Sequence, residues 1–352
     1  MGTRGYSSYH GRRSGRKFAI VAVLLALFLA AVGYLVLQNF IVYESDGSIR
    51  LELPFFEKDE TVVDDDELID APPVEILPGD DELDEQPLPP AEEIRASLIS
   101  AAALCRDPAL QFQTAADAGC NAVVVPAKGD NGVYYYTSPL AKVKATDSHA
   151  VSQQLLQSAL EETQLRRIAQ LSCFHDSFYA FSDMAGTGIC QSNGYIWYDN
   201  QSSYWLEPSK SAARAYLCAV AQECVTMGFD ELLLTEFTYP TLGKLDKIDY
   251  STMTMSKEDA LEMFLVELRA AVGDEIAVSV VLPEETILAG RDETAGLDVS
   301  RIVPVVDRIY VAAMDRGAVL TALETAGAAN AAGMTVWMGE DGSFTSAFLE
   351  TE

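Results

Sequence analysis

Seven short apolar runs rich in β-branched residues recur along residues 94–352, with amphipathic stretches between them. Such runs are typical of buried strands, and strands that alternate with helices form parallel sheets in α/β folds. The expected strands are residues 95–102, 121–127, 167–174, 231–237, 276–282, 308–314 and 334–338. The expected helices are residues 107–119, 148–162, 209–227, 256–272 and 316–332.

The size of this region suits a TIM-type (β/α)8 barrel, which takes about 250 residues. The pattern yields seven strands rather than eight, and two explanations stay open. Either the tail at residues 343–350 makes a degenerate eighth strand, or the barrel is incomplete at its C-terminus. We therefore expect one barrel domain over residues 94–352.

The N-terminus carries a run of 20 residues without charge, from Phe18 to Leu37. As a helix this run is about 30 Å long, the thickness of a bilayer core. Basic residues precede it and acidic residues follow, so the basic side should stay in the cytoplasm. We expect a basic cytoplasmic tail at residues 1–17 and a transmembrane signal-anchor helix at residues 18–40. A cleaved signal peptide is the alternative.

Residues 41–93 form an acidic segment with many prolines. From Glu44 to Glu93 there are 19 acidic against 2 basic residues. Like charges repel and proline blocks helix and sheet, so we expect a disordered linker that holds the barrel outside the cell membrane. The whole chain has a net charge of −29, and a nucleic-acid partner is not expected because a polyanion needs a basic face.

Four segments of the predicted barrel carry motifs. Residues 119–132 read GCNAVVVPAKGDNG, residues 174–176 read FHD, residues 205–208 read WLEP, and residues 228–240 read GFDELLLTEFTYP. They resemble, in order, the G-x-N-A-V-V-x-D-x-K-D-x-x-G, F-K-D, W-x-D-P and G-F-D-E-I-x-x-D-Y-V-R-F-P motifs of a bacterial glycoside hydrolase domain family. The resemblance implies a membrane-anchored or secreted TIM barrel that acts on polysaccharide.

The sequence departs from the family motifs at several polar positions. Thr235 stands where the family has the aspartate of the fourth strand, Thr238 replaces its arginine, and Pro126 replaces the aspartate of the second strand. Residues 312–317, AAMDRG, replace a polar motif after the sixth strand. Whether the chain is an active glycoside hydrolase or an inactive relative therefore stays open.

Glycoside hydrolysis uses two carboxyl groups that flank the scissile bond, and barrel sites form at the C-terminal ends of strands. The candidate catalytic residues are Glu236, Glu340 and Asp176. Glu236 lies at the C-terminal end of the fourth expected strand and Glu340 follows the seventh, the two places where many retaining barrel glycosidases have their glutamates. Asp176 matches the family motif. Successive strand residues face opposite sides, so Glu236 beside Thr235 can also point outward.

Six further residues are candidates for binding a substrate. Lys128 matches the family lysine, His175 adjoins Asp176, and flat aromatic rings suit carbohydrate stacking. The alternatives are a structural ion pair of Lys128 with Asp176 and rings that pack a long loop. The candidate substrate-binding residues are Lys128, His175, Trp197, Tyr198, Trp205 and Tyr239.

The sequence indicates no metal and no cofactor. The three histidines show no metal-ligand spacing, and no glycine-rich phosphate loop is present. Six cysteines lie after residue 93. Cys173 and Cys190 can pair as a disulfide after export, or the thiols can stay free and buried.

Two functions fit these observations. The first is a single-pass, membrane-anchored, extracytoplasmic glycoside-hydrolase-like protein that acts on cell-envelope or extracellular polysaccharide. The second is a catalytically inactive barrel that binds carbohydrate or a protein partner at the cell surface.

Overall fold

The computed structural model describes residues 41–43, 49–51, 93–142, 150–251 and 253–346. The chain divides into two units, Met1–Glu82 and Leu83–Glu352. In the first unit, β1 (Ile41–Tyr43) and β2 (Ile49–Leu51) pair as antiparallel strands. The predicted linker therefore contains a short two-stranded sheet.

The expected N-terminal tail, the expected transmembrane helix and most of the expected linker lie outside the described residues. Within the described ranges, no helix combines the length and the apolar character that a membrane crossing requires.

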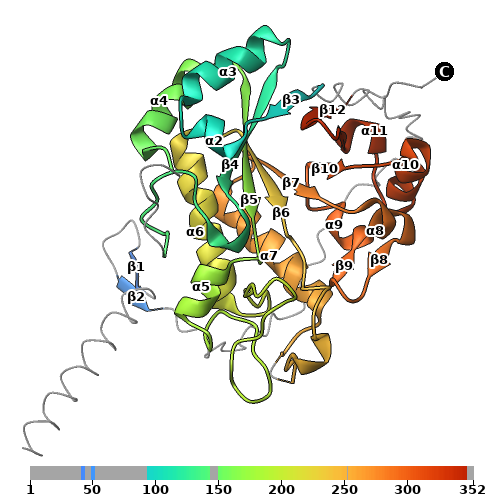
Figure 1. Ribbon diagram of the computed structural model, residues 1–352. Coiled ribbons are helices and arrows are strands. Elements are labelled where there is room, and N and C mark those ends of the chain that lie inside the picture. Colours follow the sequence, from blue (N-terminus) through green and yellow to red (C-terminus); the bar gives the residue numbers. More distant parts are fainter. Residues whose placement is uncertain (1–40, 44–48, 52–92, 143–149, 252, 347–352) are drawn as a thin grey trace, which may run out of the picture. The chain divides into compact units, whose positions relative to one another are not determined.

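The second unit is a closed eight-stranded barrel with the strand order β10-β11-β12-β3-β4-β5-β6-β7 (Figure 1). Seven strands are parallel: β3 (Arg95–Leu98), β4 (Ala122–Lys128), β5 (Arg166–Ser172), β6 (Glu231–Thr235), β7 (Ala277–Val281), β10 (Arg308–Val311) and β11 (Thr335–Met338). Each coincides with an expected strand.

The eighth strand comes from the C-terminal tail. β12 (Ser343–Thr345) pairs antiparallel with β11 on one side and with β3 on the other. The expectation of a degenerate eighth strand is confirmed, and the expectation of an incomplete barrel is wrong. Only a few residues connect β11 to β12, which is too short for a crossover helix, so β12 can return only as an antiparallel hairpin partner.

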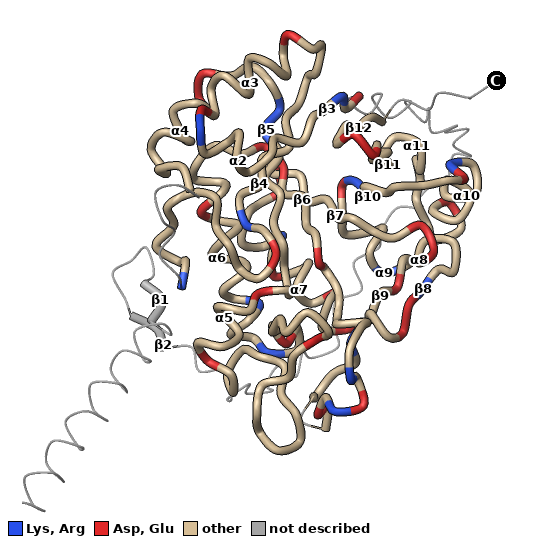
Figure 2. The backbone as a smooth tube through the Cα atoms, viewed as in Figure 1, with Lys and Arg blue, Asp and Glu red and all other residues tan. Residues whose placement is uncertain are grey.

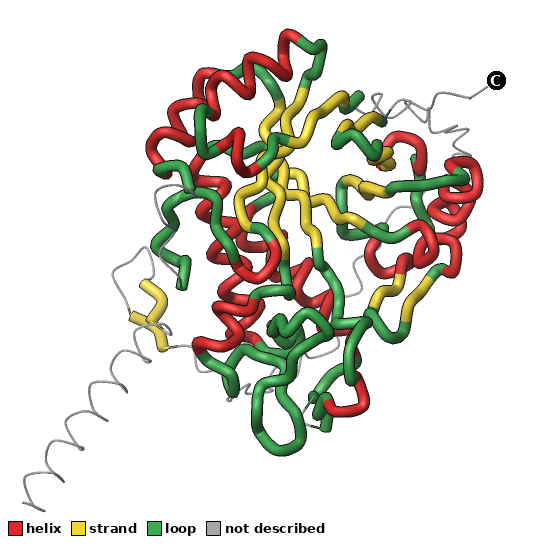
Figure 3. Tube along the Cα trace, viewed as in Figure 1, coloured by secondary structure: helices red, strands yellow, loops and turns green. Residues whose placement is uncertain are grey.

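Helices cover the outside of the barrel, and long loops gather at the C-terminal ends of β5 and β6 (Figure 3). The helices are α2 (Ala101–Leu104), α3 (Pro108–Asp117), α4 (Gln153–Glu162), α5 (Ser177–Ser182), α6 (Ser211–Met227), α7 (Lys257–Val272), α8 (Glu284–Ala289), α9 (Val299–Ile302), α10 (Arg316–Thr325) and α11 (Ala331–Met334), with 3-10 turns η1 (Asp130–Gly132) and η2 (Leu245–Lys247). A hairpin of β8 (Arg291–Asp292) and β9 (Leu297–Asp298) follows α8. The sequence did not predict α2, α5, α8, α9 or this hairpin, and the strand expected at residues 95–102 ends at Leu98 because α2 begins at Ala101.

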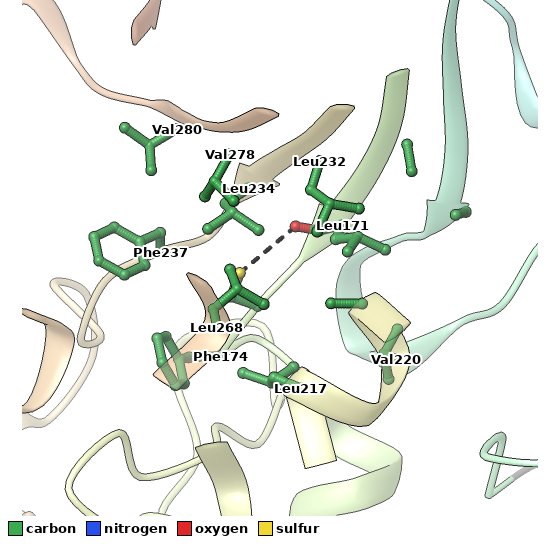
Figure 4. Packing of buried hydrophobic residues seen from close by; sticks show 14 of the residues in the cluster. Leu171, Phe174, Leu217, Val220, Leu232, Leu234, Phe237, Leu268, Val278 and Val280 are labelled. Carbon is green, nitrogen blue, oxygen red and sulfur yellow. Dashed lines mark hydrogen bonds between the residues drawn. The ribbon is translucent and has the colours of Figure 1, made fainter. Parts of the chain in front are cut away.

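Two apolar layers hold the barrel together. The inner layer fills the barrel with side chains from every second strand position: Ile94, Ala96, Ala122, Val124, Ile168, Leu233, Tyr310, Val336 and Phe344. The outer layer packs the opposite strand faces against α6 and α7, with Leu171 and Leu234 meeting Leu217 and Leu268 (Figure 4). Because both strand faces are buried, the strands read as continuous apolar runs.

The N-terminal end of the barrel is closed by a buried polar cluster around Glu231, which is 0% exposed. Its two carboxylate oxygens accept hydrogen bonds from Arg166 Nε at 2.8 Å, Arg308 Nη1 at 2.9 Å, Ser279 Oγ at 2.7 Å and Tyr310 Oη at 3.0 Å. The full set of donors explains how a carboxylate can be buried at this end.

Candidate functional site

A cavity of about 720 Å³ opens at the C-terminal mouth of the barrel. Its floor is formed by the last inward-facing residues of five strands or strand ends: Gln170, Thr235, Val281, Ala312 and Met338. Its walls come from the loop after β4, the loop after β6, α8 and the β8–β9 hairpin. This is the end of a barrel at which enzymes of this architecture build their sites.

Every charged residue that lines the cavity is acidic. The five carboxylates belong to Asp130, Glu236, Glu284, Glu285 and Asp292. Acidic positions on α8 and the β8–β9 hairpin are visible as red segments in Figure 2. The lining of the mouth therefore presents negative charge and no basic side chain to whatever enters it.

Glu236 lines the cavity because of one irregular backbone angle. The residue has a φ of 47°, in the left-handed region that non-glycine residues seldom adopt. Strict alternation after the inward-facing Thr235 would point Glu236 outward. The left-handed turn instead directs the carboxylate toward the mouth, and the backbone is fixed there because Phe174 N donates to the Glu236 carbonyl at 3.2 Å.

The surroundings of Glu236 change the pKa of its carboxyl group. Partial burial raises its pKa above the ordinary value, and the negative charges of Asp130 and Asp199 raise the pKa further. A carboxyl group whose pKa is raised in a cleft suits general acid catalysis near neutral pH. Backbone strain also concentrates at functional sites, so two independent features single out the same residue.

The left-handed conformation of Glu236 gives a stability prediction. We expect Glu236→Gly to be more stable than Glu236→Ala by about 1 kcal/mol, because an L side chain is strained at positive φ and glycine is not. Chemical denaturation of the two variants measures the difference. Thr235 has regular strand geometry, so Thr235→Gly should be less stable than Thr235→Ala. If the glycine variant were the more stable one at both positions, the left-handed conformation of Glu236 would be contradicted.

Two further polar residues lie behind Glu236. Asp199 accepts hydrogen bonds from Trp205 Nε1 at 3.0 Å and from the backbone N–H groups of Gln201 and Ser203 at 2.8 and 2.9 Å. His175 stacks on Trp205 with ring centres 4.6 Å apart, and its Nε2 lies 3.8 Å from Asp199 Oδ2. Burial lowers the pKa of His175. His175 is 7% exposed and does not line the cavity.

Lys128 and Asp176 form a buried ion pair outside the barrel. Lys128 Nζ lies 3.1 Å from Asp176 Oδ2, and the two side chains are 0% and 1% exposed. A register shift between Pro126 and Lys128 pairs Lys128 with the outward-facing Leu171 instead of continuing the inward series. The bulge thus turns Lys128 away from the cavity. Of the two interpretations left open, the geometry is that of a structural ion pair.

The remaining sequence candidates also lie away from the cavity. Glu340 is exposed in the turn between β11 and β12. Trp197, Trp205 and Tyr239 are 1%, 7% and 0% exposed and pack the long loops over the barrel. Tyr198 is 56% exposed, but it does not line the cavity. Of the nine candidates, the structure places Glu236 in the mouth.

Sequence reasoning missed Asp130, Glu284, Glu285 and Asp292 as cavity residues. Asp130 stands in the motif of residues 119–132, two residues after the matched lysine, at a position that the family motif leaves unspecified. The other three lie on α8 and the β8–β9 hairpin, which the strand and helix pattern did not reveal.

No set of three or more histidine, cysteine, aspartate or glutamate side chains with metal-binding geometry occurs among the described residues. All six cysteines are free, so the pairing of Cys173 with Cys190 is not formed.

The family model for "Putative glycosyl hydrolase domain" matches residues 99–315, more than half of the chain. The chain belongs to this family, and it has the eight-stranded α/β barrel that the motifs implied.

Three solved structures illustrate what the fold is similar to. A hypothetical protein from Ruminiclostridium thermocellum is 21% identical over 52% of this chain and 96% of that chain, with a TM-score of 0.44. The glycoside hydrolase domain of PelA from Pseudomonas aeruginosa is 15% identical over 62% and 66%, with a TM-score of 0.34. A Flavobacterium johnsoniae chitobiase is 10% identical over 67% and 43%, with a TM-score of 0.43. No curated protein matches the chain.

Proposed function

We propose that the barrel hydrolyses glycosidic bonds in its C-terminal mouth, with Glu236 as the general acid. The observation that carries the proposal is the placement of Glu236. A left-handed backbone turn brings this carboxyl group into the 720 Å³ cavity, and its surroundings favour the protonated form. A protonated carboxyl at this point can donate to the oxygen of a leaving sugar.

The charge of the lining restricts the substrate. The cavity has five carboxylates and no basic side chain among its lining residues. A polymer of uronic acids or phosphodiesters would be repelled, whereas a neutral glycan or one with free amino groups would not. We therefore propose a neutral or amino-sugar polysaccharide of the cell envelope as the substrate.

Replacing the acid tests the function. We expect Glu236→Gln to lower kcat at least about 100-fold on oligosaccharides of glucose, N-acetylglucosamine or glucosamine, because the amide keeps the shape but cannot give up a proton. Reducing-end release measures the rate. In the native protein, kcat/KM should fall as pH rises through the raised pKa of Glu236, because the donor is then lost.

Two matched variants control this experiment. Glu275→Gln changes the same group at an exposed position before β7, at the opposite end of the barrel, and should keep full activity. Glu340→Gln tests the pair of glutamates expected from sequence and should also stay active, since Glu340 does not line the cavity. Equal activity of Glu236→Gln and the native protein would exclude Glu236 as the acid.

A second candidate function is carbohydrate binding without hydrolysis. The observation that favours it is the uncharged floor of the mouth, where Thr235 occupies the position of the family aspartate. On this alternative the native protein binds an oligosaccharide of the same panel in calorimetry, and no reducing ends appear after prolonged incubation.

We also propose that the protein is held in the cell membrane by residues 18–40, with the barrel outside. The uncharged run and the basic residues before it support this topology. External protease added to intact cells should remove the barrel; protection of the barrel until the cells are lysed would contradict the proposal.

A further inference from the structure

We infer that Asp130 is the second carboxylate of the reaction, and that it accepts the proton of the water molecule that attacks the sugar. This inference rests on the proposed function, because it assigns a partner to Glu236. It gives the site a pair of carboxyl groups on two strand ends, as glycoside hydrolysis requires.

Asp130 and Glu236 line the same cavity from separate strands. Asp130 follows β4 and Glu236 follows β6, and both border the mouth. Of the charges that raise the pKa of Glu236, that of Asp130 has the largest effect, and the same holds for the charges that act on His175. The charge of Asp130 therefore acts on the Glu236 carboxyl group across the opening of the cavity.

The backbone that carries Asp130 is held rigidly. Asn131 and Gly132 follow it with φ values of 61° and 80°, two left-handed residues in succession. A Cβ atom on Gly132 would lie 2.0 Å from Asp176 Oδ1, so only glycine allows this approach. Ser177 Oγ donates to Asn131 Oδ1 at 2.8 Å and ties the turn to α5.

The buried ion pair explains why the turn has this shape. Asp176 is fixed by Lys128 Nζ at 3.1 Å and by Tyr216 Oη, which donates to Asp176 Oδ2 at 2.9 Å. Gly132 packs directly on that carboxylate. Lys128, Asp176 and Gly132 thus act as positioning residues, and Asp130 is the member of this segment that reaches the cavity.

Two other carboxylates of the cavity, and Asp199 near it, already accept hydrogen bonds from N–H groups. Glu284 accepts from the backbone N–H groups of Met314 and Asp315 at 2.9 to 3.1 Å. Asp292 accepts from Thr294 N and Ala295 N at 2.9 and 3.0 Å.

Asp199 is held by Trp205 and two backbone N–H groups, and it does not line the cavity. Carboxylates with filled acceptor positions are weak proton acceptors. Glu285, exposed in the first turn of α8, is the alternative that experiment must exclude.

The strand order sets how far apart the two strands that lead to the pair lie. β5 lies between β4 and β6, so the two strand backbones are about 9 to 10 Å apart. A wide separation leaves room for water between a carboxylate and the anomeric carbon, as in inverting hydrolysis. Glu236 gives its proton to the leaving oxygen as the C–O bond breaks, water oxygen bonds to the carbon, and Asp130 takes the water proton.

The test uses 2,4-dinitrophenyl and unactivated glycosides of glucose, N-acetylglucosamine and glucosamine. A dinitrophenolate leaves without a proton, so Glu236→Gln should regain most of its activity on the activated substrates. Asp130→Asn should lose at least about 100-fold in kcat on both kinds of substrate, because water must be activated in each case. Asp274→Asn, with the same charge change at an exposed position before β7, is the control.

The pH profile separates a catalytic role from a structural one. Asp130→Asn should remove the rise of kcat/KM on the acid side. It should also move the alkaline fall to lower pH, because one of the charges that raise the pKa of Glu236 is gone while Asp199 and His175 remain nearby. Proton NMR of the first-formed sugar should show inversion at the anomeric carbon.

Several results would overturn the inference. Asp130→Asn could stay active while Glu236→Gln is inactive, which would leave the proposed function standing. Glu285→Gln could show the loss in place of Asp130→Asn, or the product could retain its configuration. Absence of hydrolysis by the native protein on every substrate would overturn the proposed function and this inference together.

Discussion

Lys128→Met is expected to destabilise the barrel by about 3 to 5 kcal/mol. The side chain of Lys128 is 0% exposed, and its Nζ also donates to the Ser172 carbonyl at 2.6 Å. Removing it leaves the Asp176 carboxylate, 1% exposed, without its counter-charge. The cost of an isolated buried charge is large, whereas the cost of losing the pair together is small. Urea denaturation followed by tryptophan fluorescence measures the change.

Two variants make this prediction specific to burial. Adding Asp176→Asn to Lys128→Met removes both charges and should recover most of the lost stability. Lys247→Met removes one partner of an exposed pair with nearly the same N···O distance, 3.2 Å to Asp246, and should cost less than about 1 kcal/mol. If Lys128→Met and Lys247→Met had equal effects, the buried position of the first pair would be wrong.

Glu231→Leu is also expected to cost about 3 to 5 kcal/mol. It would leave two arginines and two hydroxyl groups at the N-terminal end of the barrel without their common acceptor. Burial, together with the charge of Glu231, raises the pKa of Tyr310 in this cluster. The free energy of unfolding by urea measures the loss, and Glu231→Gln should give an intermediate value.

Glu236 lies five residues after Glu231. Its replacement by glutamine should change the free energy of unfolding in the opposite direction. Its pKa is raised in the folded state, so its contribution to stability is present below the unfolded pKa and is lost as pH rises through the folded pKa. Glu236→Gln should therefore be at least as stable as the native protein at neutral pH, with no gain in acid. Destabilisation by Glu231→Gln and Glu236→Gln alike would contradict the different roles given to the two residues.

The periodic pattern of the sequence was enough to locate the barrel strands. Each apolar run from β3 to β11 is a strand, because apolar side chains on both faces have few other ways to be buried. The motifs of residues 119–132 and 228–240 were enough to indicate the family that the chain matches. Elements such as α8 and the β8–β9 hairpin were missed because they are short and follow no long apolar period.

The candidate site was less predictable because it depends on two local irregularities. Strict alternation from Ala122 and Val124 would place Lys128 inside the barrel. In the same way, strict alternation after Thr235 would turn Glu236 outward. The bulge before Lys128 and the left-handed angle at Glu236 reverse both orientations. A single extra residue or a single positive φ exchanges the faces of a strand, and neither has a clear signature in the residue types.

The sequence by itself determined that the chain has a long uncharged run near its N-terminus, an acidic segment and an α/β domain with glycoside hydrolase motifs. Only the tertiary structure decided that β12 closes the barrel as an antiparallel strand, that Asp176 is buried with Lys128, and that Asp130 and Glu236 share the mouth. The physical reason is that burial favours apolar strands wherever they occur along the chain, whereas the direction of one side chain depends on backbone angles that its distant neighbours fix.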